Sequence, residues 1–250
     1  MSDGSSAGVT ARRNFLRKLG AGAAATAMAA AFPASARAAV SERKVQYGML
    51  IDTRRCIGCH ACTVACKAEF DVPLGSTRSW VEYVEKGNYP NVSRSFLPRL
   101  CNHCSEPNCV AVCPTGATYK RKEDGIVVVD PDICIGCKYC IQACPYDARF
   151  INPVTGTADK CDFCLHRVSQ GLVPACVETC IGKARIFGDI NDPDSEISRL
   201  IATNPVSVLR PEKGTQPNVF YIAADHTGEN DRESGQYVSV TTHRKQKSRR

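Results

Sequence analysis

The chain has 250 residues, of which 43% are hydrophobic and only 7% aromatic, and 16 are cysteines. Its formal charge of +7 falls to +3 when the first 38 residues, with five basic side chains and one acidic one, are set aside. Cysteines that bind metal do so as thiolates, so metal binding by the cysteines would make the net charge negative. The sequence has no basic stripe interleaved with aromatic residues, so we expect no nucleic-acid partner.

The first 38 residues have the features of an export signal. The pair Arg12 and Arg13 precedes a weakly apolar stretch at residues 19–32, and small residues at 34–38 offer a cleavage site. This stretch is too short to cross a bilayer as a helix. An alanine-rich amphipathic N-terminus is the alternative. We expect a twin-arginine signal peptide over residues 1–38, and therefore a periplasmic protein that is exported folded, with its thiols protected from oxidation.

Short elements are expected on both sides of a cysteine-rich middle. After a polar linker at residues 39–46, a strand at residues 45–52 leads into the first cysteines. Alternating side chains at residues 80–84 predict a second strand, whose aromatic residues we interpret as cover over a buried site. Segments 117–120 and 126–129 flank an Asp-Gly turn and predict a β-hairpin.

The last third of the chain is predicted to hold a helix at about residues 195–203 and a strand at 219–223. Residues 226–250 are polar and basic, which predicts a disordered tail; docking on a partner or an anionic membrane is the alternative. Hairpins and short helices together predict an α+β fold with two pseudo-symmetric ferredoxin-like lobes, each built for two [4Fe–4S] clusters.

The cysteines fall into four groups of four. They are Cys56, Cys59, Cys62 and Cys66; Cys101, Cys104, Cys109 and Cys113; Cys134, Cys137, Cys140 and Cys144; and Cys161, Cys164, Cys176 and Cys180. The first and third groups share the spacing C-x2-C-x2-C-x3-C within an internal repeat of residues 51–66 and 129–144. Duplication of a two-cluster ferredoxin unit is the economical explanation.

The repeated spacing suits an iron–sulfur cubane. A C-x2-C-x2-C loop wraps around one corner of the cluster, and Gly58 and Gly136 lie where the backbone must approach inorganic sulfide closely. In two-cluster ferredoxins the fourth cysteine of such a run ligates the other cluster. We expect that fourth cysteine to begin a short helix that leads away from the loop.

Three other uses of cysteine compete with this interpretation. A disulfide framework needs only an even number of cysteines, but four near-identical quartets and a folded-export leader disfavour it. Zinc sites use two separated pairs, which leaves no place for a third cysteine two residues further on. Residues 56–60 match the C-x-x-C-H haem motif, yet the third group lacks the histidine. We therefore interpret His60 as a surface or sulfur-neighbouring residue.

Two motifs carry a resemblance to a known family. Cys-Pro-Tyr-Asp-Ala-Arg-Phe at 144–150 and Lys-Cys-Asp-Phe-Cys-x-His-Arg at 160–167, together with the four quartets, resemble the iron–sulfur subunit of the DMSO-reductase superfamily over residues 47–223. Segments 97–104 and 180–190 are most similar to the tetrathionate reductase type. The segment at residues 72–91 is similar to the polysulfide reductase type, and arsenate and thiosulfate reductase subunits are also similar.

The resemblance implies a set of ligands for four [4Fe–4S] clusters. They are Cys56, Cys59, Cys62 and Cys180; Cys66, Cys161, Cys164 and Cys176; Cys101, Cys104, Cys109 and Cys144; and Cys113, Cys134, Cys137 and Cys140. It also implies one domain at residues 39–225 whose lobes interleave, residues 47–75 with 155–190 forming one and residues 97–154 the other. No catalytic residues are expected.

The implied function is electron transfer. The chain would be a component of an oxidoreductase and no enzyme by itself, relaying electrons between a quinol-oxidising membrane subunit of the NrfD type and a molybdopterin catalytic subunit. Partner contacts would hold it at the membrane surface. The alternatives are a free-standing periplasmic polyferredoxin, or the corresponding subunit of a polysulfide, thiosulfate or arsenate reductase.

Overall fold

The computed structural model describes residues 44–224 and 235–238. The predicted signal peptide at residues 1–38 lies outside the described residues, as does most of the predicted tail. Within that tail, Gly235–Val238 form strand β11. No helix in the described part of the chain is long and apolar enough to span a membrane.

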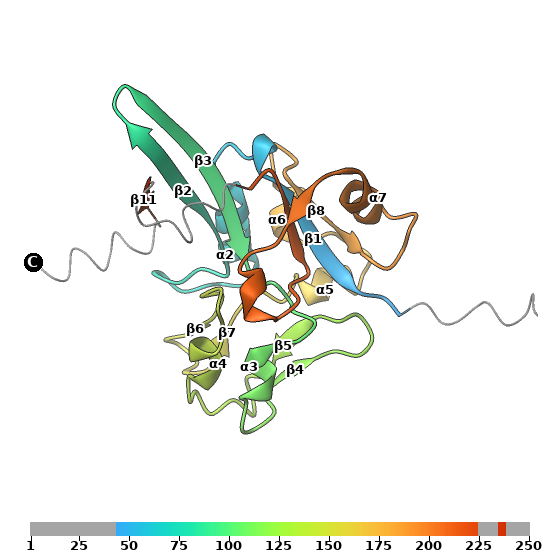
Figure 1. Cartoon of the computed structure of the whole chain (residues 1–250). Helices are drawn as coiled ribbons and strands as arrows, with labels where there is room; N and C mark the ends of the chain where they lie inside the picture. The colour runs from blue at the N-terminus through green and yellow to red at the C-terminus, as the bar shows by residue number, and fades with distance from the viewer. Residues whose placement is uncertain (1–43, 225–234, 239–250) are drawn as a thin grey trace, which may run out of the picture. The chain divides into compact units, whose positions relative to one another are not determined.

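A four-stranded sheet forms the centre of the structure (Figure 1). Its strands, in spatial order, are β8 (Arg185–Asp189), β1 (Tyr47–Asp52), β10 (Val219–Ile222) and β9 (Val206–Ser207). β1 pairs parallel with β10 and antiparallel with β8, so the first and last parts of the domain are hydrogen-bonded to each other. The strands predicted at 45–52 and 219–223 are both present.

The two faces of this sheet pack against different cores because successive side chains of a strand point to opposite faces. Met49 and Ile51 join the large core that contains the buried cysteines, whereas Leu50 joins a smaller core with Ile197. Ile197 lies on helix α7 (Glu196–Thr203), which was predicted at residues 195–203. Ser195 caps this helix by accepting a hydrogen bond from the Ser198 backbone N–H at 3.2 Å.

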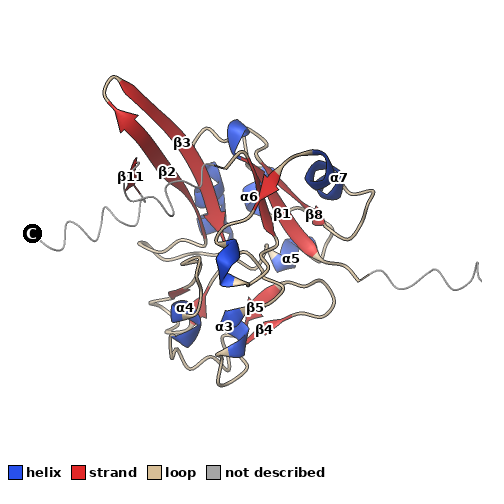
Figure 2. Ribbon diagram, in the orientation of Figure 1, coloured by secondary structure: helices blue, strands red, loops and turns tan. Residues whose placement is uncertain are grey.

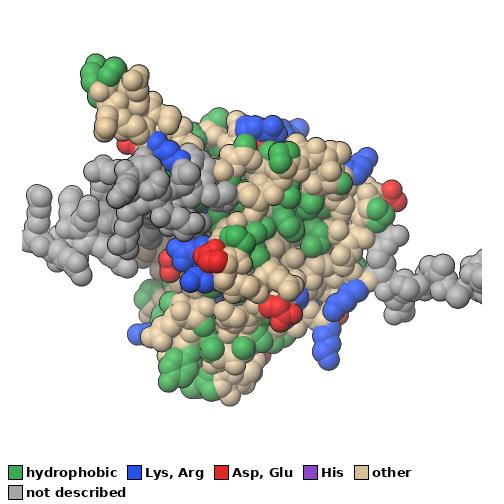
Figure 3. Space-filling view, viewed as in Figure 1, with side chains coloured by type: hydrophobic (Ala, Val, Ile, Leu, Met, Phe, Trp, Pro, Cys, Tyr) green, Lys and Arg blue, Asp and Glu red, His purple; other side chains and the backbone are tan. Residues whose placement is uncertain are grey.

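A long hairpin extends from the sheet region (Figure 1). Its strands β2 (Ser79–Asn88) and β3 (Asn91–Leu100) pair antiparallel along their whole length, and β11 pairs with the outer edge of β2. The inner half of the hairpin is buried, while Tyr89 at its tip is 94% exposed. The end of the hairpin protrudes from the rest of the surface in the space-filling view (Figure 3). The predicted strand at 80–84 is the buried half of β2.

The middle of the chain forms smaller units (Figure 2). Strands β4 (Thr118–Lys120) and β5 (Val127–Val129) make the hairpin predicted at 117–129. Strands β6 (Phe150–Ile151) and β7 (Ala158–Asp159) make a second short hairpin. Two 3-10 turns lie at Thr53–Arg55 and Pro211–Lys213.

The remaining helices are short and accompany the cysteines. They are α2 (Ala61–Glu69), α3 (Asn108–Ala111), α4 (Tyr139–Gln142), α5 (Leu165–Val168) and α6 (Ala175–Glu178). The mixture of short helices and small sheets is compatible with ferredoxin-like lobes. α2 packs against α6, and β1 pairs with β8, so the segments at 47–69 and 175–189 are neighbours.

Replacing Ser195 with Ala should loosen α7 without disturbing the cysteines, because the helix covers the other face of the sheet. Loss of an N-cap costs about 1 kcal/mol, which is roughly a fivefold change in an opening equilibrium. Hydrogen exchange of the amides in Glu196–Thr203 should accelerate by about that factor while the iron content stays constant. The control is Ser169→Ala, whose hydroxyl donates to the His166 carbonyl at the C-terminal end of α5 and has no part in α7. Unchanged exchange in α7, or loss of iron, would contradict this assignment.

Candidate metal centre

Three cavities in the described structure are each lined by four cysteines. Site 1 has Cys56, Cys59, Cys62 and Cys180; site 3 has Cys101, Cys104, Cys109 and Cys144; site 4 has Cys113, Cys134, Cys137 and Cys140. Their atom-free volumes are about 350, 340 and 300 Å³ respectively. The identical donor sets of four sulfurs indicate the same kind of occupant in each cavity.

The remaining four cysteines, Cys66, Cys161, Cys164 and Cys176, are all buried and form site 2. Burial, together with the nearby Cys176 and Cys164 sulfurs, raises the pKa of Cys66 to about 12. Burial likewise raises the pKa of Cys161, with contributions from Cys66 and Cys176. The four sulfurs are therefore close enough to interact electrostatically. None of the sixteen cysteines forms a disulfide.

The two repeated loops adopt the same local conformation. Gly58 and Gly136 have φ angles of +70° and +65°, and His60 and Lys138, which precede helices α2 and α4, are also left-handed. Glycine has no Cβ and adopts this conformation without strain. A Cβ on Gly136 would lie 2.5 Å from the Gly156 carbonyl oxygen, so close backbone packing within the protein adds a second reason for glycine.

The prediction that the fourth cysteine begins a helix is wrong. Helix α2 begins at Ala61, so its first turn holds Cys62 and its second holds Cys66. In the other groups, the short helix contains the third cysteine (Cys109, Cys140 or Cys176), and the fourth follows it. Because residues i and i+4 are one helical turn apart, α2 carries one sulfur of site 1 and one of site 2 about 6 Å further along its axis.

Backbone amides reach several of the sulfurs. The N–H groups of Ala184, Thr118, Phe163 and Ala158 donate to Cys180, Cys113, Cys161 and Cys134 at 3.2, 3.4, 3.5 and 3.5 Å. Such hydrogen bonds stabilise negative charge on sulfur and help to set the potential of an iron–sulfur cluster. They reach cysteines of sites 1, 2 and 4.

Aromatic residues cover site 1. Tyr83 donates its hydroxyl to the Gly58 carbonyl at 3.1 Å, and its oxygen lies 2.6 Å from Nε2 of His60. Phe96 packs edge-on against Tyr83. His60 therefore has a tyrosine partner beside the cysteine loop, as expected for a sulfur-neighbouring residue. The aromatic side chains of β2 and β3 serve as cover at this site.

Comparison with known proteins decides the family. Two models described as "4Fe-4S dicluster domain" match residues 92–190 and 55–118. The chain is 52% identical to the B subunit of tetrathionate reductase from Salmonella typhimurium, over 86% of this chain and 89% of that protein. This chain belongs to the family of iron–sulfur subunits of the DMSO-reductase superfamily. The predicted resemblance is thus confirmed.

Other members of the family match over similar lengths. Protein NrfC of Escherichia coli is 44% identical over 84% of this chain and 94% of its own length. The B subunit of selenate reductase from Mesobacillus selenatarsenatis is 43% identical over 72% of each chain. Relatives in this iron–sulfur family are thus named as subunits of different reductases, for tetrathionate and for selenate.

Three buried, positively charged side chains near sites 1 to 4 need compensating negative charge, which anionic groups bound at these sites would provide. Arg149, Lys160 and Arg185 are 5%, 3% and 3% exposed, and within the part of the chain that the structure describes none has a carboxylate at ion-pair distance. A buried charge is costly unless an opposite charge compensates it. Cysteine thiolates with iron–sulfur clusters are such compensating anions, and the donor set of four sulfurs per site suits them.

The sequence reasoning missed these cations. A usable signal was present, since Cys144 and Cys180 are each followed, five residues later, by an arginine with alanine before it. The resulting C-x3-A-R pattern occurs in the segments at 144–149 and 180–185, in addition to the cysteine spacing. A third cysteine, Cys113, has Ala117 and Thr118 in the corresponding places.

The tight packing around Gly136 yields a prediction. Gly136→Ala should reduce iron bound at site 4, because the added Cβ meets a backbone oxygen and the positive φ costs about 1–2 kcal/mol. Gly116→Ala is the matched control, since φ is +71° there and nothing lies within 4 Å of the Cβ position. Iron and sulfide content of the two variants, purified anaerobically, is the measurement. Equal losses in both would mean that backbone strain alone, and not the close approach to Gly156, matters.

Proposed function

We propose that this chain relays electrons through four [4Fe–4S] clusters held at sites 1 to 4, each by the four cysteines that define the site. A bound cluster of this type supplies reversible one-electron transfer. The observation that carries the proposal is the sorting of twelve cysteines into three like cavities, with the other four gathered in the core. These are the same sets that the family resemblance implies.

Two of the sets join distant parts of the sequence. Cys180 completes the site formed by Cys56, Cys59 and Cys62, and Cys144 completes the site formed by the group at 101–109. The fourth cysteine of one group thus serves the site of another, as in two-cluster ferredoxins. This exchange ties adjacent sites together through short pieces of backbone such as α2.

The sites follow one another in the order 1, 2, 3, 4. Arg185 lines site 1 and lies 3.8 Å from the Cys176 sulfur of site 2. Cys101 of site 3 contributes to the raised pKa of Cys161 in site 2, after burial and the neighbouring site 2 sulfurs. Arg149 lines site 3 and donates to Thr118, which lines site 4. This succession supports a linear relay.

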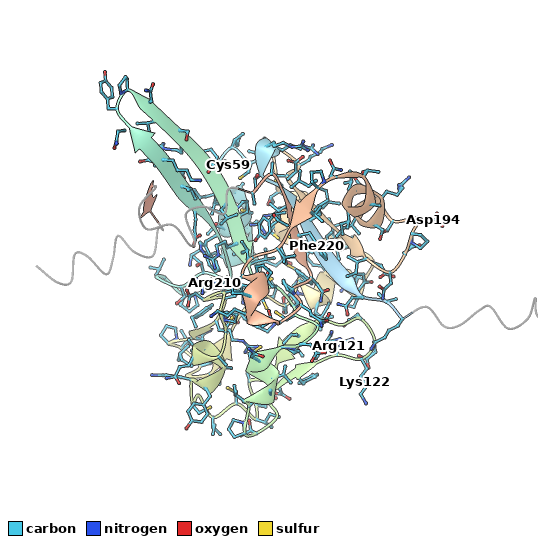
Figure 4. The ribbon with its side chains drawn as sticks, in the orientation of Figure 1. Cys59, Arg121, Lys122, Asp194, Arg210 and Phe220 are labelled. Carbon is cyan, nitrogen blue, oxygen red and sulfur yellow. The ribbon has the colours of Figure 1, made fainter. Side chains whose placement is uncertain are left out.

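The two ends of the relay are the exposed ones. Cys59 of site 1 and Cys137 of site 4 are the exposed cysteines, whereas all four of site 2 are buried. Ile57 and Ile135, at equivalent places in the repeated loops, are 60% and 67% exposed. Figure 4 shows Cys59 near the base of the long hairpin, well away from α4, which carries Cys140 of site 4. Two separate exposed apolar positions suit two partners.

The proposed partners are a molybdopterin catalytic subunit and an NrfD-type membrane subunit that oxidises quinol. The support is that the relatives are named as B subunits of tetrathionate and selenate reductases. Among these, we propose a complex of the tetrathionate reductase type, because this chain is 52% identical to the B subunit of a tetrathionate reductase. The proposed location is the periplasm, at the membrane surface through partner contacts, with export by the twin-arginine pathway.

Purification from the native host tests the partners. The tagged chain should copurify with a large molybdenum-containing subunit and an integral membrane subunit, and the complex should reduce tetrathionate with quinol as donor. Recovery of the chain alone, with clusters intact and exchange of electrons by diffusion, would favour a free-standing polyferredoxin. Reduction of polysulfide, thiosulfate or arsenate in place of tetrathionate would assign another substrate to the same relay.

Crossed ligation gives a sharp prediction. Cys180→Ser and Cys56→Ser should perturb the same EPR signal, although 124 positions separate them, because both line site 1. Cys137→Ser, at the exposed position of site 4, serves as control and should perturb a different signal. Different signals for Cys180→Ser and Cys56→Ser would refute the proposed ligand sets.

Export yields an independent prediction. Replacing Arg12 and Arg13 together with Lys should leave the chain in the cytoplasm with its clusters assembled, since the twin-arginine pair is the recognised feature of the leader. Cell fractionation and immunoblotting measure the location, and iron content measures assembly. Replacing Arg17 and Lys18 with Gln is the control for general loss of leader charge. Periplasmic recovery of the twin-lysine variant would rule out the proposed route.

A further inference from the structure

Two buried arginines occupy equivalent places in the sequence and in the row of sites. Arg149 follows Cys144 by five residues, and Arg185 follows Cys180 by five. Both cysteines are the last of their groups and both arginines are preceded by alanine. The two arginines are 5% and 3% exposed. A repeated, buried, positively charged residue at a fixed distance from a cysteine requires a physical reason.

Arg185 lies between sites 1 and 2. It lines the site 1 cavity together with Cys56 and Cys62. Its Nη1 lies 3.8 Å from the Cys176 sulfur of site 2 and 3.9 Å from the Met49 sulfur. Among the described residues, its buried Nη2 has no hydrogen-bond partner. The guanidinium therefore contacts a site 2 sulfur while its residue lines site 1.

Arg149 lies between sites 3 and 4 in the same manner. Its Nη2 donates to the Cys109 sulfur of site 3 at 3.0 Å, and its Nη1 donates to Thr118 at 3.2 Å. Thr118 lines the site 4 cavity, and its own N–H donates to the Cys113 sulfur. Nε of Arg149 has no hydrogen-bond partner within residues 44–224. Each arginine thus spans the gap between two neighbouring sites.

Both arginines carry a positive charge, because a guanidinium group is not deprotonated in proteins. In the part of the chain that the structure describes, neither has a carboxylate at ion-pair distance. The cysteine sulfurs that they contact are therefore the groups placed to compensate this charge.

We propose that Arg185 and Arg149 are potential-setting residues, each raising the reduction potentials of the two clusters that flank it. The proposal rests on cluster binding at sites 1 to 4. Reduction adds a negative charge to a cluster, and a fixed positive charge nearby in a buried, poorly screened place stabilises that added charge. A cation shared by two neighbours also offsets the repulsion between them, so both members of a pair can be reduced.

The test measures potentials in neutral and charge-conserving variants. Arg185→Gln should lower the reduction potentials of the site 1 and site 2 clusters and leave those of sites 3 and 4 unchanged. Arg149→Gln should lower the reduction potentials of the site 3 and site 4 clusters and leave those of sites 1 and 2 unchanged. The expected change is about tenfold or more in the equilibrium constant for reduction, which is about 59 mV for a one-electron couple. The measurement is an EPR-monitored redox titration of the anaerobically purified chain, with signals assigned through the cysteine variants.

Arg→Lys variants and Arg55 provide the controls. Arg185→Lys and Arg149→Lys keep the charge and should restore most of the potential. Arg55 lines the site 1 cavity but is exposed, so solvent screens it and Arg55→Gln should move the potentials far less than Arg185→Gln. Figure 3 shows basic side chains on the surface, where such screening applies.

The outcomes are distinguishable. The inference would be overturned if the reduction potentials were unchanged in the Gln variants, or if they fell equally in all four clusters. Equal losses of iron in the Gln and Lys variants would also overturn it. If Gln variants lose the flanking clusters while Lys variants keep them, the positive charge is confirmed as the required feature. A wild-type chain without four clusters would instead overturn the proposed function itself.

Discussion

The constraint on which this structure depends is the negative charge that sixteen closely grouped cysteines would carry as cluster ligands. Sixteen cysteines lie between residues 56 and 180 and are gathered into four adjacent sites. Thiolates and the clusters that they bind are anionic, and burying anions without compensation is costly. Backbone N–H groups that donate hydrogen bonds to sulfur offset part of this cost, as do the buried cations Arg149, Lys160 and Arg185. The small sheets and short helices hold those donors in place.

The sequence was informative wherever a local pattern determined the structure. The buried half of β2 and the hairpin at 118–129 follow from alternation and from an Asp-Gly turn. The strand at Tyr47–Asp52 and helix α7 also lie where they were predicted. The cysteine quartets follow from spacing and family resemblance. The start of each cysteine helix was misjudged, because the helical turn already holds the third cysteine before the fourth is reached. Arg149 and Arg185 were missed because the repeated C-x3-A-R pattern marks their positions but does not reveal their burial between sites.

The exposure of the sites is consistent with an electron relay that has two accessible ends. All four cysteines of site 2 are buried, whereas site 1 has the exposed Cys59 and site 4 has the exposed Cys137. Apolar side chains such as Ile57 and Ile135 stand beside the exposed ends. Electrons would enter and leave only at the ends, and the buried interior would keep solvent and oxidants from the middle of the relay. This arrangement suits a subunit placed between two partners, as proposed for the tetrathionate-type complex.

The central claim is that all sixteen cysteines hold four [4Fe–4S] clusters in one chain. Iron and acid-labile sulfide on the anaerobically purified mature protein, with EPR spectra after stepwise reduction, test it most directly. The account predicts about sixteen irons and sixteen sulfides per chain, from four sites of four irons each, with interacting signals of reduced [4Fe–4S] clusters and no signal of an oxidised three-iron cluster. A low iron content with bound zinc, or thiols paired as disulfides, would contradict it.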